Sequence, residues 1–503
     1  MHIIEIQGIV KQFPLVRAVD HVDFTVRAGE IHSLLGENGA GKTCLMKTLY
    51  GMFRPDEGRI LIDGREVSFN SPKDAIAEGI GMVHQHFLLS PVMTVAENII
   101  VGKEPRTKHG FLDMDAAISQ VQDLIDTYRF NIDAKALVST LSVGEQQRVE
   151  ILKALWRGAQ ILILDEPTAV LTPQEVDELF VIMRRLKASG TGIVIITHKL
   201  KETLAIADTI SVLRAGKMVV HRQALGNVTA EDLASMMVGR KVELAVHTTK
   251  KTIGEPYFFV EHLSLTRSGI PVLKDINLTI HRGEILGIAG VEGNGQTELV
   301  EALTGLCSPQ SMSVRKGKEE ITGSARDFIH AGIGHIPEDR LVRVLVVQMD
   351  IGTNIVLGYH DKPAFTKWGF LDFKAIYRYA GEKIREYRIK TPNAHQPVSS
   401  LSGGNQQKVV VARVISQNPD VLIVSQPTRG VDVGAMEYIH HRILALKEEG
   451  KAVLLVSADL DEVLNLSDRI AVMYEGSIVA VKDKQDVTMA QLGLLMAGGN
   501  EHA

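Results

Sequence analysis

The stretch from Gly36 to Thr43 combines small, flexible positions with a lysine and a hydroxyl, and these residue types can bind phosphate. It fits the P-loop pattern G-x-x-x-x-G-K-S/T, in which backbone N–H groups close around phosphate oxygens at the start of a helix. The segment Ile31-His-Ser-Leu-Leu35 precedes it and is expected to be a buried strand, and a helix-like segment follows, as this motif requires. We therefore predict a nucleotide site formed by Gly36, Glu37, Asn38, Gly39, Ala40, Gly41, Lys42, Thr43 and Cys44.

Two carboxylates further along the chain can complete this chemistry. The apolar run 161–164 ends in Asp165 and Glu166. We expect Asp165 to hold Mg²⁺ together with Thr43, and Lys42 to reach the β- and γ-phosphates. Glu166 is placed to orient or deprotonate the attacking water. An ordinary polar strand end is the alternative, and the P-loop upstream argues against it.

Three further residues have weaker signals. Phe13 could stack on an adenine ring, or it could be an exposed aromatic at a strand end. Gln85 could sense Mg²⁺ or the γ-phosphate, although a solvated loop residue would look the same. A lone histidine is more often structural, but His198 ends the apolar run 193–197 at the edge where the other motifs lie. We therefore favour contact between His198 and the γ-phosphate.

Composition limits the classes of protein that the chain can form. Its 503 residues should make two or more domains, and a net charge of −5 gives no basic footprint for nucleic acid. The two cysteines, Cys44 and Cys307, cannot form a disulfide framework or a zinc cluster, which fits a reducing compartment. We find no signal peptide and no apolar run near the 18 or so residues that span a bilayer. Any membrane role is expected to be peripheral.

The second half of the chain repeats the first. The P-loop at 36–43 recurs as 290–297, and Leu141-Ser-Val-Gly-Glu-Gln-Gln recurs as Leu401-Ser-Gly-Gly-Asn-Gln-Gln. Units of this length are domains rather than solenoid repeats. We predict one domain at 1–244 and another at 257–503, joined by a short linker.

Each half should be an α/β domain. Short alternating segments open it and predict antiparallel strands, and apolar strands that alternate with helices then predict a largely parallel sheet. Around 95–140 and 350–395 the pattern becomes helical, which indicates an inserted helical subdomain.

These motifs in this order resemble the nucleotide-binding subunit of an ABC transporter, over almost all of both repeats. The family's own signature is the Leu-Ser-Gly-Gly pattern that follows the helical insert. The resemblance implies two tandem P-loop, RecA-like ATPase domains packed head to tail, with each ATP between the P-loop of one and the signature of the other. It implies that Ser402, Gly403 and Gly404 contact the nucleotide bound at the first P-loop, and that Asp432 belongs to the same site.

The second repeat departs from the family pattern at its own P-loop. The lysine is replaced by Gln296, the Asp-Glu pair by Ser425 and Gln426, and the histidine by Ala458. A glutamate, Glu338, stands where the first repeat has Gln85. A site without the lysine charge, the metal carboxylate and the base should hydrolyse ATP poorly.

If the two repeats pair head to tail, all of these substitutions fall in the same one of the two nucleotide sites. The degraded P-loop would face the first signature, where Val143 replaces a glycine and Thr172 stands at the family's aspartate position. The intact P-loop would face the intact second signature. We therefore predict one catalytic site per chain, and a second site that is empty or holds nucleotide without turnover. The catalytic site would use Lys42, Thr43, Gln85, Asp165, Glu166, His198, Ser402, Gly404 and Asp432.

The tandem arrangement resembles the ATPase subunit of bacterial importers for simple sugars and related solutes. The segments 81–89, 93–99 and 425–430 resemble the branch that imports nucleosides. A monosaccharide such as ribose or galactose is the alternative. A soluble tandem ATPase that acts on ribosomes or DNA is a further alternative, disfavoured by the degraded site, the short linker and the absence of zinc cysteines.

Such importers imply partners for this chain. They are two transmembrane permease subunits and a solute-binding protein, with no nucleic acid, and the chain would lie at the cytoplasmic face of the membrane. A short permease helix would dock between the P-loop core and the helical insert. Glu97, Asn98 and Asn354 are candidates for that contact, or they could be helix caps.

Overall fold

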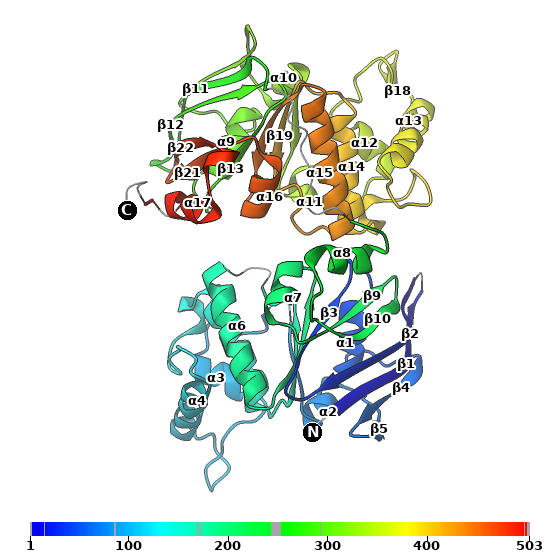
Figure 1. Cartoon of the computed structure of the whole chain (residues 1–503), viewed down its shortest axis with the longest axis vertical. Coiled ribbons are helices and arrows are strands. Elements are labelled where there is room, and N and C mark those ends of the chain that lie inside the picture. Colours follow the sequence, from blue (N-terminus) through cyan, green and yellow to red (C-terminus); the bar gives the residue numbers. More distant parts are fainter. Residues whose placement is uncertain are drawn as a thin grey trace. The chain divides into compact units, whose positions relative to one another are not determined.

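The structure is a computed structural model of the 503-residue chain, and it describes residues 3–14, 16–84, 87–168, 171, 173–242, 253–291, 293–496 and 498–499. The chain forms two compact units, residues 1–242 and 243–503. Each unit contains the same arrangement of sheets and helices (Figure 1). The two are described separately.

Two sheets form the framework of the first unit. The antiparallel sheet has the order β2-β1-β4-β5, and the core sheet has the order β10-β9-β3-β8-β7-β6. Neighbours from β9 to β6 in the core sheet run parallel, and β10 pairs antiparallel with β9. The strands are β1 (Ile3–Phe13), β2 (Val16–Arg27), β3 (Ile31–Leu35), β4 (Glu57–Ile62), β5 (Arg65–Val67), β6 (Ile80–Val83), β7 (Ile161–Asp165), β8 (Gly192–Thr197), β9 (Thr209–Arg214) and β10 (Lys217–Ala224).

Helices cover the core sheet and form the predicted insert. A buried cluster that includes Leu45, Met46 and Leu49 joins the first helix to both sheets. The insert helices pack around a second cluster on the other side of the core sheet. The helices are α1 (Lys42–Leu49), α2 (Pro72–Ala77), α3 (Val95–Ile100), α4 (Met114–Tyr128), α5 (Val143–Trp156), α6 (Pro173–Ala188), α7 (Leu200–Ile206) and α8 (Ala230–Val238).

The second unit repeats this topology. Its antiparallel sheet has the order β12-β11-β14-β15, and its core sheet has the order β16-β19-β20-β13-β21-β22. The strands are β11 (Pro256–Arg267), β12 (Ile270–His281), β13 (Ile285–Ala289), β14 (Ser311–Lys316), β15 (Glu319–Glu320), β16 (Ile333–Ile336), β19 (Val421–Ser425), β20 (Ala452–Val456), β21 (Arg469–Tyr474) and β22 (Ser477–Asp483). The helices are α9 (Gln296–Leu303), α10 (Ala325–His330), α11 (Arg340–Arg343), α12 (Ile351–Val356), α13 (Phe373–Glu386), α14 (Gly403–Ile415), α15 (Val433–Glu448), α16 (Leu460–Leu466) and α17 (Met489–Met496).

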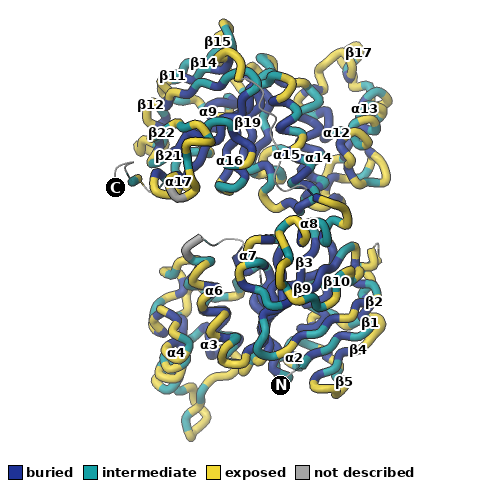
Figure 2. Tube along the Cα trace, in the orientation of Figure 1, coloured by how far each residue is buried: buried dark blue, intermediate teal, exposed yellow. Residues whose placement is uncertain are grey.

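The central strands of both core sheets are buried along their whole length, as their largely apolar sequences predict (Figure 2). In β3 the buried polar side chains of His32 and Ser33 bond to Ser211 and Thr203. The predicted α/β class, the antiparallel subdomain and the parallel core are confirmed. No helix in the described part of the chain is both long enough and apolar enough to cross a bilayer.

We expected the insert of the second unit to be helical, but part of it is a β-hairpin. Strands β17 (Thr366–Lys367) and β18 (Phe370–Leu371) form a small hairpin within it. The two turn residues, Trp368 and Gly369, have φ values of 55° and 80°. Two positive φ angles are what a tight hairpin turn of the primed type requires, and Gly369 allows this at little cost. The two turn residues, and not the helical sequence pattern around them, therefore determine the local structure here.

Candidate nucleotide site

The P-loop of the first unit joins the buried strand β3 to helix α1. Gly41 precedes the first residue of α1 and has a φ of 105°, which favours glycine. A Cβ atom at this position would lie 2.2 Å from the carbonyl oxygen of Ala18. Only glycine therefore fits, and the first backbone N–H groups of α1 remain available for an anion.

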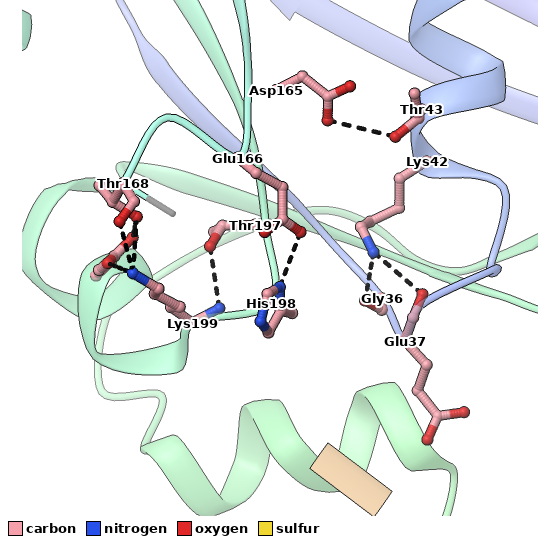
Figure 3. Close-up of polar contacts among 11 residues, drawn as sticks. Gly36, Glu37, Lys42, Thr43, Asp165, Glu166, Thr168, Thr197, His198 and Lys199 are labelled. Atoms are coloured by element: carbon pink, nitrogen blue, oxygen red, sulfur yellow. Dashed lines mark hydrogen bonds and ion pairs between the residues drawn. The ribbon is translucent and has the colours of Figure 1, made fainter. Parts of the chain in front are cut away.

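Lys42 lies inside this loop and not on the surface. Lys42 is only 6% exposed. Its Nζ atom donates to the carbonyl oxygen of Gly36 at 2.6 Å and to that of Glu37 at 3.1 Å. Figure 3 shows the lysine reaching back across the loop. Because a buried ammonium needs hydrogen-bond acceptors, these carbonyls hold the positive charge in the phosphate cradle.

A hydroxyl and a carboxylate meet where α1 begins and β7 ends. The Oγ1 atom of Thr43 donates to Oδ1 of Asp165 at 3.3 Å (Figure 3). Burial raises the pKa of Asp165; the hydrogen bond from Thr43 opposes this shift, and the charge of Glu166 adds to it. Oxygen ligands of this kind suit a hard divalent cation. Among the described residues, no group of three or more His, Cys, Asp or Glu side chains could hold a metal ion, so an ion at this site would also need phosphate or water ligands.

Glu166 follows Asp165 in a strained backbone conformation. Its φ is 51°, a left-handed value that costs about 1–3 kcal/mol for a residue other than glycine. Its backbone N–H donates to the carbonyl of Ile196 at 2.9 Å, which ties it to strand β8. Its side chain thereby turns toward the residue that follows β8 (Figure 3).

That residue is His198, whose Nδ1 atom lies 2.8 Å from Oε1 of Glu166. Burial alone would raise the pKa of Glu166, but the hydrogen bond to His198 and the charges of His198, Lys42 and Lys199 outweigh it and lower the pKa. The carboxylate is therefore charged at neutral pH and accepts the bond from His198. A charged carboxylate held in this way can accept a proton from water.

A polar network fixes the loop that carries His198. The backbone N–H of Lys199 donates to Oγ1 of Thr197 at 3.0 Å, and its Nζ atom donates to the carbonyl of Thr168 at 2.9 Å (Figure 3). Thr168 in turn donates to Glu202 at 2.6 Å. Neither Lys199 nor Thr168 was predicted from the sequence to belong to this site. Their position just after β7 and β8 was the available signal.

Several predicted residues are not brought into this cluster. Phe13 is partly exposed at the end of β1, and its ring meets Phe53 edge-on at 5.7 Å. Its stacking on adenine stays a prediction. Gln85 and Thr172 lie outside the described residues. Cys44 is partly buried, and burial raises the pKa of its thiol.

The second unit keeps the backbone of this site without its charged side chains. The Nε2 atom of Gln296 donates to the carbonyl of Val291 at 2.9 Å, as Lys42 does within its own loop. Ser425 ends β19, and Gln426 has a φ of 48°, close to that of Glu166. Oε1 of Gln426 accepts a hydrogen bond from the backbone N–H of Ala458 at 3.2 Å. The fold is preserved while the lysine, both acids and the histidine are absent.

The two signature helices begin differently. At the start of α5, Oε1 of Glu175 accepts from the N–H of Gly144 at 3.2 Å and from the hydroxyl of Ser142 at 3.3 Å. At the start of α14, Nδ2 of Asn405 donates to Oγ of Ser402 at 2.9 Å. A carboxylate thus lies at the N-terminus of the first signature helix, and an amide lies at the second.

Gly404 is fixed beside the aspartate predicted to share its site. Asp432 caps α15 by accepting from the N–H of Ala435 at 2.8 Å. A Cβ atom on Gly404 would lie 2.8 Å from the other carboxylate oxygen of Asp432. Within the second unit, Gly404 and Asp432 are therefore neighbours.

The proposed permease contacts at Asn98 and Asn354 are wrong for the side chains. These residues are 3% and 1% exposed, and each amide bonds to the loop before its own helix. Glu97 completes a capping box with Thr94. The alternative, a solvated helix cap, is also wrong for the two asparagines, because both are buried and the N-cap residues are Thr94 and Asp350. Only Glu97 takes part in a cap.

The buried P-loop lysine, the hydroxyl–carboxylate pair and the strained glutamate define a P-loop nucleoside triphosphatase present in two copies, one of them without its charged groups. A family model described as ABC transporter matches residues 19–169 and 273–429. The chain belongs to the ABC transporter family, and within it to the ATP-binding proteins that hydrolyse ATP.

Several relatives are similar over nearly the whole chain. The nucleoside import ATP-binding protein NupA of Lactococcus lactis subsp. cremoris is 46% identical, covering 99% of this chain and 98% of its own. The guanosine import ATP-binding protein NupO of Bacillus subtilis is 46% identical with the same coverage. The glucose import ATP-binding protein TsgD13 of Haloferax volcanii is 43% identical, covering 99% and 96%.

A solved structure shares the tandem fold. The archaeal ribosome recycling factor aABCE1, in complex with the ribosomal stalk protein aP1, aligns with a TM-score of 0.63 at 18% identity. It covers 98% of this chain and 92% of its own. At this identity the likeness shows the fold alone.

Proposed function

We propose that the first unit hydrolyses Mg²⁺-bound ATP and that the second unit does not. The observation that carries this proposal is the pairing of Thr43 with Asp165 and of Glu166 with His198. Both pairs are missing from the second unit by residue type. When bound, Mg²⁺ would be held by Thr43, Asp165 and the predicted ligand Gln85, and it would neutralise phosphate charge.

The chain's own residues carry the rest of the mechanism. Lys42 neutralises charge on the β- and γ-phosphates, and the backbone N–H groups of the P-loop hold their oxygens. Glu166 orients the attacking water and accepts its proton. His198 holds the Glu166 carboxylate in place and faces the γ-phosphate. Phe13 would stack on the base.

The second signature would complete this site. Head-to-tail pairing within one chain would bring Ser402, Gly403, Gly404 and Asp432 to the γ-phosphate held by Lys42. Their fixed positions within the second unit support this proposal. The first signature would face Gln296, and its Gly144 N–H already donates to Glu175. We also propose the domain limits 1–244 and 257–503.

We propose that hydrolysis drives import of nucleosides. Two relatives at 46% identity over the whole chain have names that specify nucleoside or guanosine import, and this agrees with the segments that resemble the nucleoside branch. Import of a monosaccharide is the second candidate, favoured by the glucose importer at 43% identity. The partners would be two permease subunits and a solute-binding protein, with the chain on the cytoplasmic face of the membrane.

Uptake measurements test the proposal. Cells that contain the native permeases and either this chain or its Glu166→Gln variant are given labelled uridine or labelled ribose. We expect uridine uptake to require Glu166 and ribose uptake not to. Dependence of ribose uptake alone would replace nucleosides by a sugar, and dependence of neither would overturn both. Co-sedimentation of the chain with ribosomes and not membranes would overturn the importer role.

A further inference from the structure

Arg340 lies between two loops of the second unit. It begins α11, four residues after β16 ends. Its Nη1 atom donates to the carbonyl oxygen of Arg429 at 3.0 Å. Its Nη2 atom would lie 2.8 Å from a Cβ atom on Gly403, the first residue of the signature helix. The guanidinium therefore lies against the start of the signature helix and against the loop that leads to Asp432.

The charge of this guanidinium is only partly compensated. Its Nε atom is buried and has no hydrogen-bond partner among the described residues. Burial lowers the pKa of Arg340, and the charge of Asp339 acts in the opposite direction. The start of a helix is itself a positive pole, so this cation lies where an anion would be favoured. A phosphate arriving at the signature would supply that anion.

Two further contacts connect this segment to the Asp432 loop. The side chain of Arg429 forms an ion pair with Glu338, so Arg429 is held by its backbone and by its side chain. The next glycine, Gly430, would place a Cβ atom 3.7 Å from the Arg340 guanidinium. The segment 338–340 thus fixes the loop that ends at Asp432.

The sequence of the first unit does not repeat the charged residues of this cluster. The positions that correspond to Glu338, Arg340 and Arg429 hold Gln85, Phe87 and Ala169. By residue type, none of the three charges is present beside the first signature, whose N-terminus meets Glu175 instead. The charged cluster therefore accompanies the signature that keeps its glycines.

We propose that Arg340 is a positioning residue for ATP hydrolysis at the Lys42 site. It holds the start of the signature helix and the Asp432 loop in one arrangement, and it adds positive charge to the surface that meets the γ-phosphate. This inference rests on the proposed function, because it requires the second signature to complete the site of the first P-loop.

Steady-state turnover of the full chain with its permeases tests the role. We expect Arg340→Gln to lower kcat about 10-fold or more, but less than the roughly 100- to 1000-fold that follows loss of a donor group in direct contact with the reacting atoms, and to change KM for ATP less than about threefold. Arg340→Lys should recover part of kcat, because it keeps the charge but loses the forked contact. Arg343→Gln is the matched control on the same helix. Arg343 pairs with Glu301 at 2.6 Å, and its variant should stay within about twofold of the parent.

A second variant distinguishes the role of Arg340 from the proposed pairing of the second signature with the first P-loop. Ser402→Glu places an acid at an exposed signature position and is measured in parallel. If Ser402→Glu leaves kcat unchanged, the pairing of signature and P-loop is wrong. If it abolishes turnover while Arg340→Gln retains full kcat, the pairing stands and the role of Arg340 is wrong. Equal losses for Arg340→Gln, Arg340→Lys and Arg343→Gln would show that the segment only stabilises the fold.

Discussion

Glu166 and His198 are 32 positions apart in the sequence, yet Oε1 of one lies 2.8 Å from Nδ1 of the other. They follow β7 and β8, which are parallel neighbours in the core sheet. Because parallel strands end at the same edge of a sheet, their next residues meet there. This contact fixes the direction of the carboxylate within the first unit.

Loss of the Glu166 carboxylate charge should stop ATP hydrolysis while the protein still binds ATP. We expect Glu166→Gln to lower kcat about 10²- to 10⁴-fold, the range for loss of a general base, while ATP binding persists. Release of labelled phosphate and retention of labelled ATP measure the two effects. Gln426→Glu in the parent chain is the matched control and should not raise turnover. Full turnover in Glu166→Gln would contradict the role of this residue.

The two P-loops should respond unequally to truncation. We expect Lys42→Ala to lower turnover about 10²-fold or more, because it removes the charge that faces the phosphates. Gln296→Ala should remain within about twofold of the parent, since its amide makes only a local loop contact. Gln296→Lys alone should not double the number of phosphates released. Equal losses in the two alanine variants would be incompatible with one working site.

Stability should depend on pH through Asp165. Its pKa is raised in the folded state, mainly by burial, so the unfolded chain loses this proton first as the pH rises. The Asp165 carboxyl therefore lowers stability from about pH 4 upward, until it ionises in the folded state as well. We expect Asp165→Asn to raise Tm at pH 7 in EDTA, with the difference vanishing below about pH 4.

Magnesium supplies the control for that measurement. Mg²⁺ with ATP should raise the Tm of the parent chain more than that of Asp165→Asn, because only the parent offers a carboxylate to the ion. A higher Tm for the parent in EDTA at pH 7, or equal Mg²⁺ shifts for the two proteins, would count against this assignment.

A carboxylate introduced at each signature should lower turnover to very different extents. Ser402→Glu should lower turnover about 100-fold, since it places an acid at the signature assigned to the working site. Ser142→Glu should leave turnover within about threefold, because the N-terminus of α5 already meets Glu175. Phosphate release by both variants under identical conditions is the measurement. A larger loss in Ser142→Glu would reverse the assignment of signatures.

The sequence predicts where the residues of the first site lie, because each is close to the carboxyl end of a parallel strand. Asp165 ends β7, His198 follows β8, and Lys42 begins the helix after β3, so all three could be placed at one sheet edge from the strand pattern. The order of the strands in the core sheet could not be predicted from the sequence pattern. β3 lies between β8 and β9, and these pairings depend on long-range packing. The contact between Glu166 and His198 follows from that order.

Other features depend on geometry that residue types do not reveal. A buried asparagine such as Asn98 has the same sequence signal as an exposed one at a helix start. The hairpin at Trp368 and Gly369 required two turn residues to override a helical pattern. Arg340 is one of many charged residues in the sequence, and only the fold brings it to Gly403.

Gln426 keeps the left-handed backbone of Glu166, and Ala458 keeps a hydrogen bond to it, although neither residue can perform the chemistry. The strained turn is thus a requirement of the strand-to-loop passage rather than a mark of catalysis. It follows that this fold can exchange the chemical groups of a site without a change in the main chain that carries them. The course of the backbone is therefore no guide to whether a copy of this fold carries those groups.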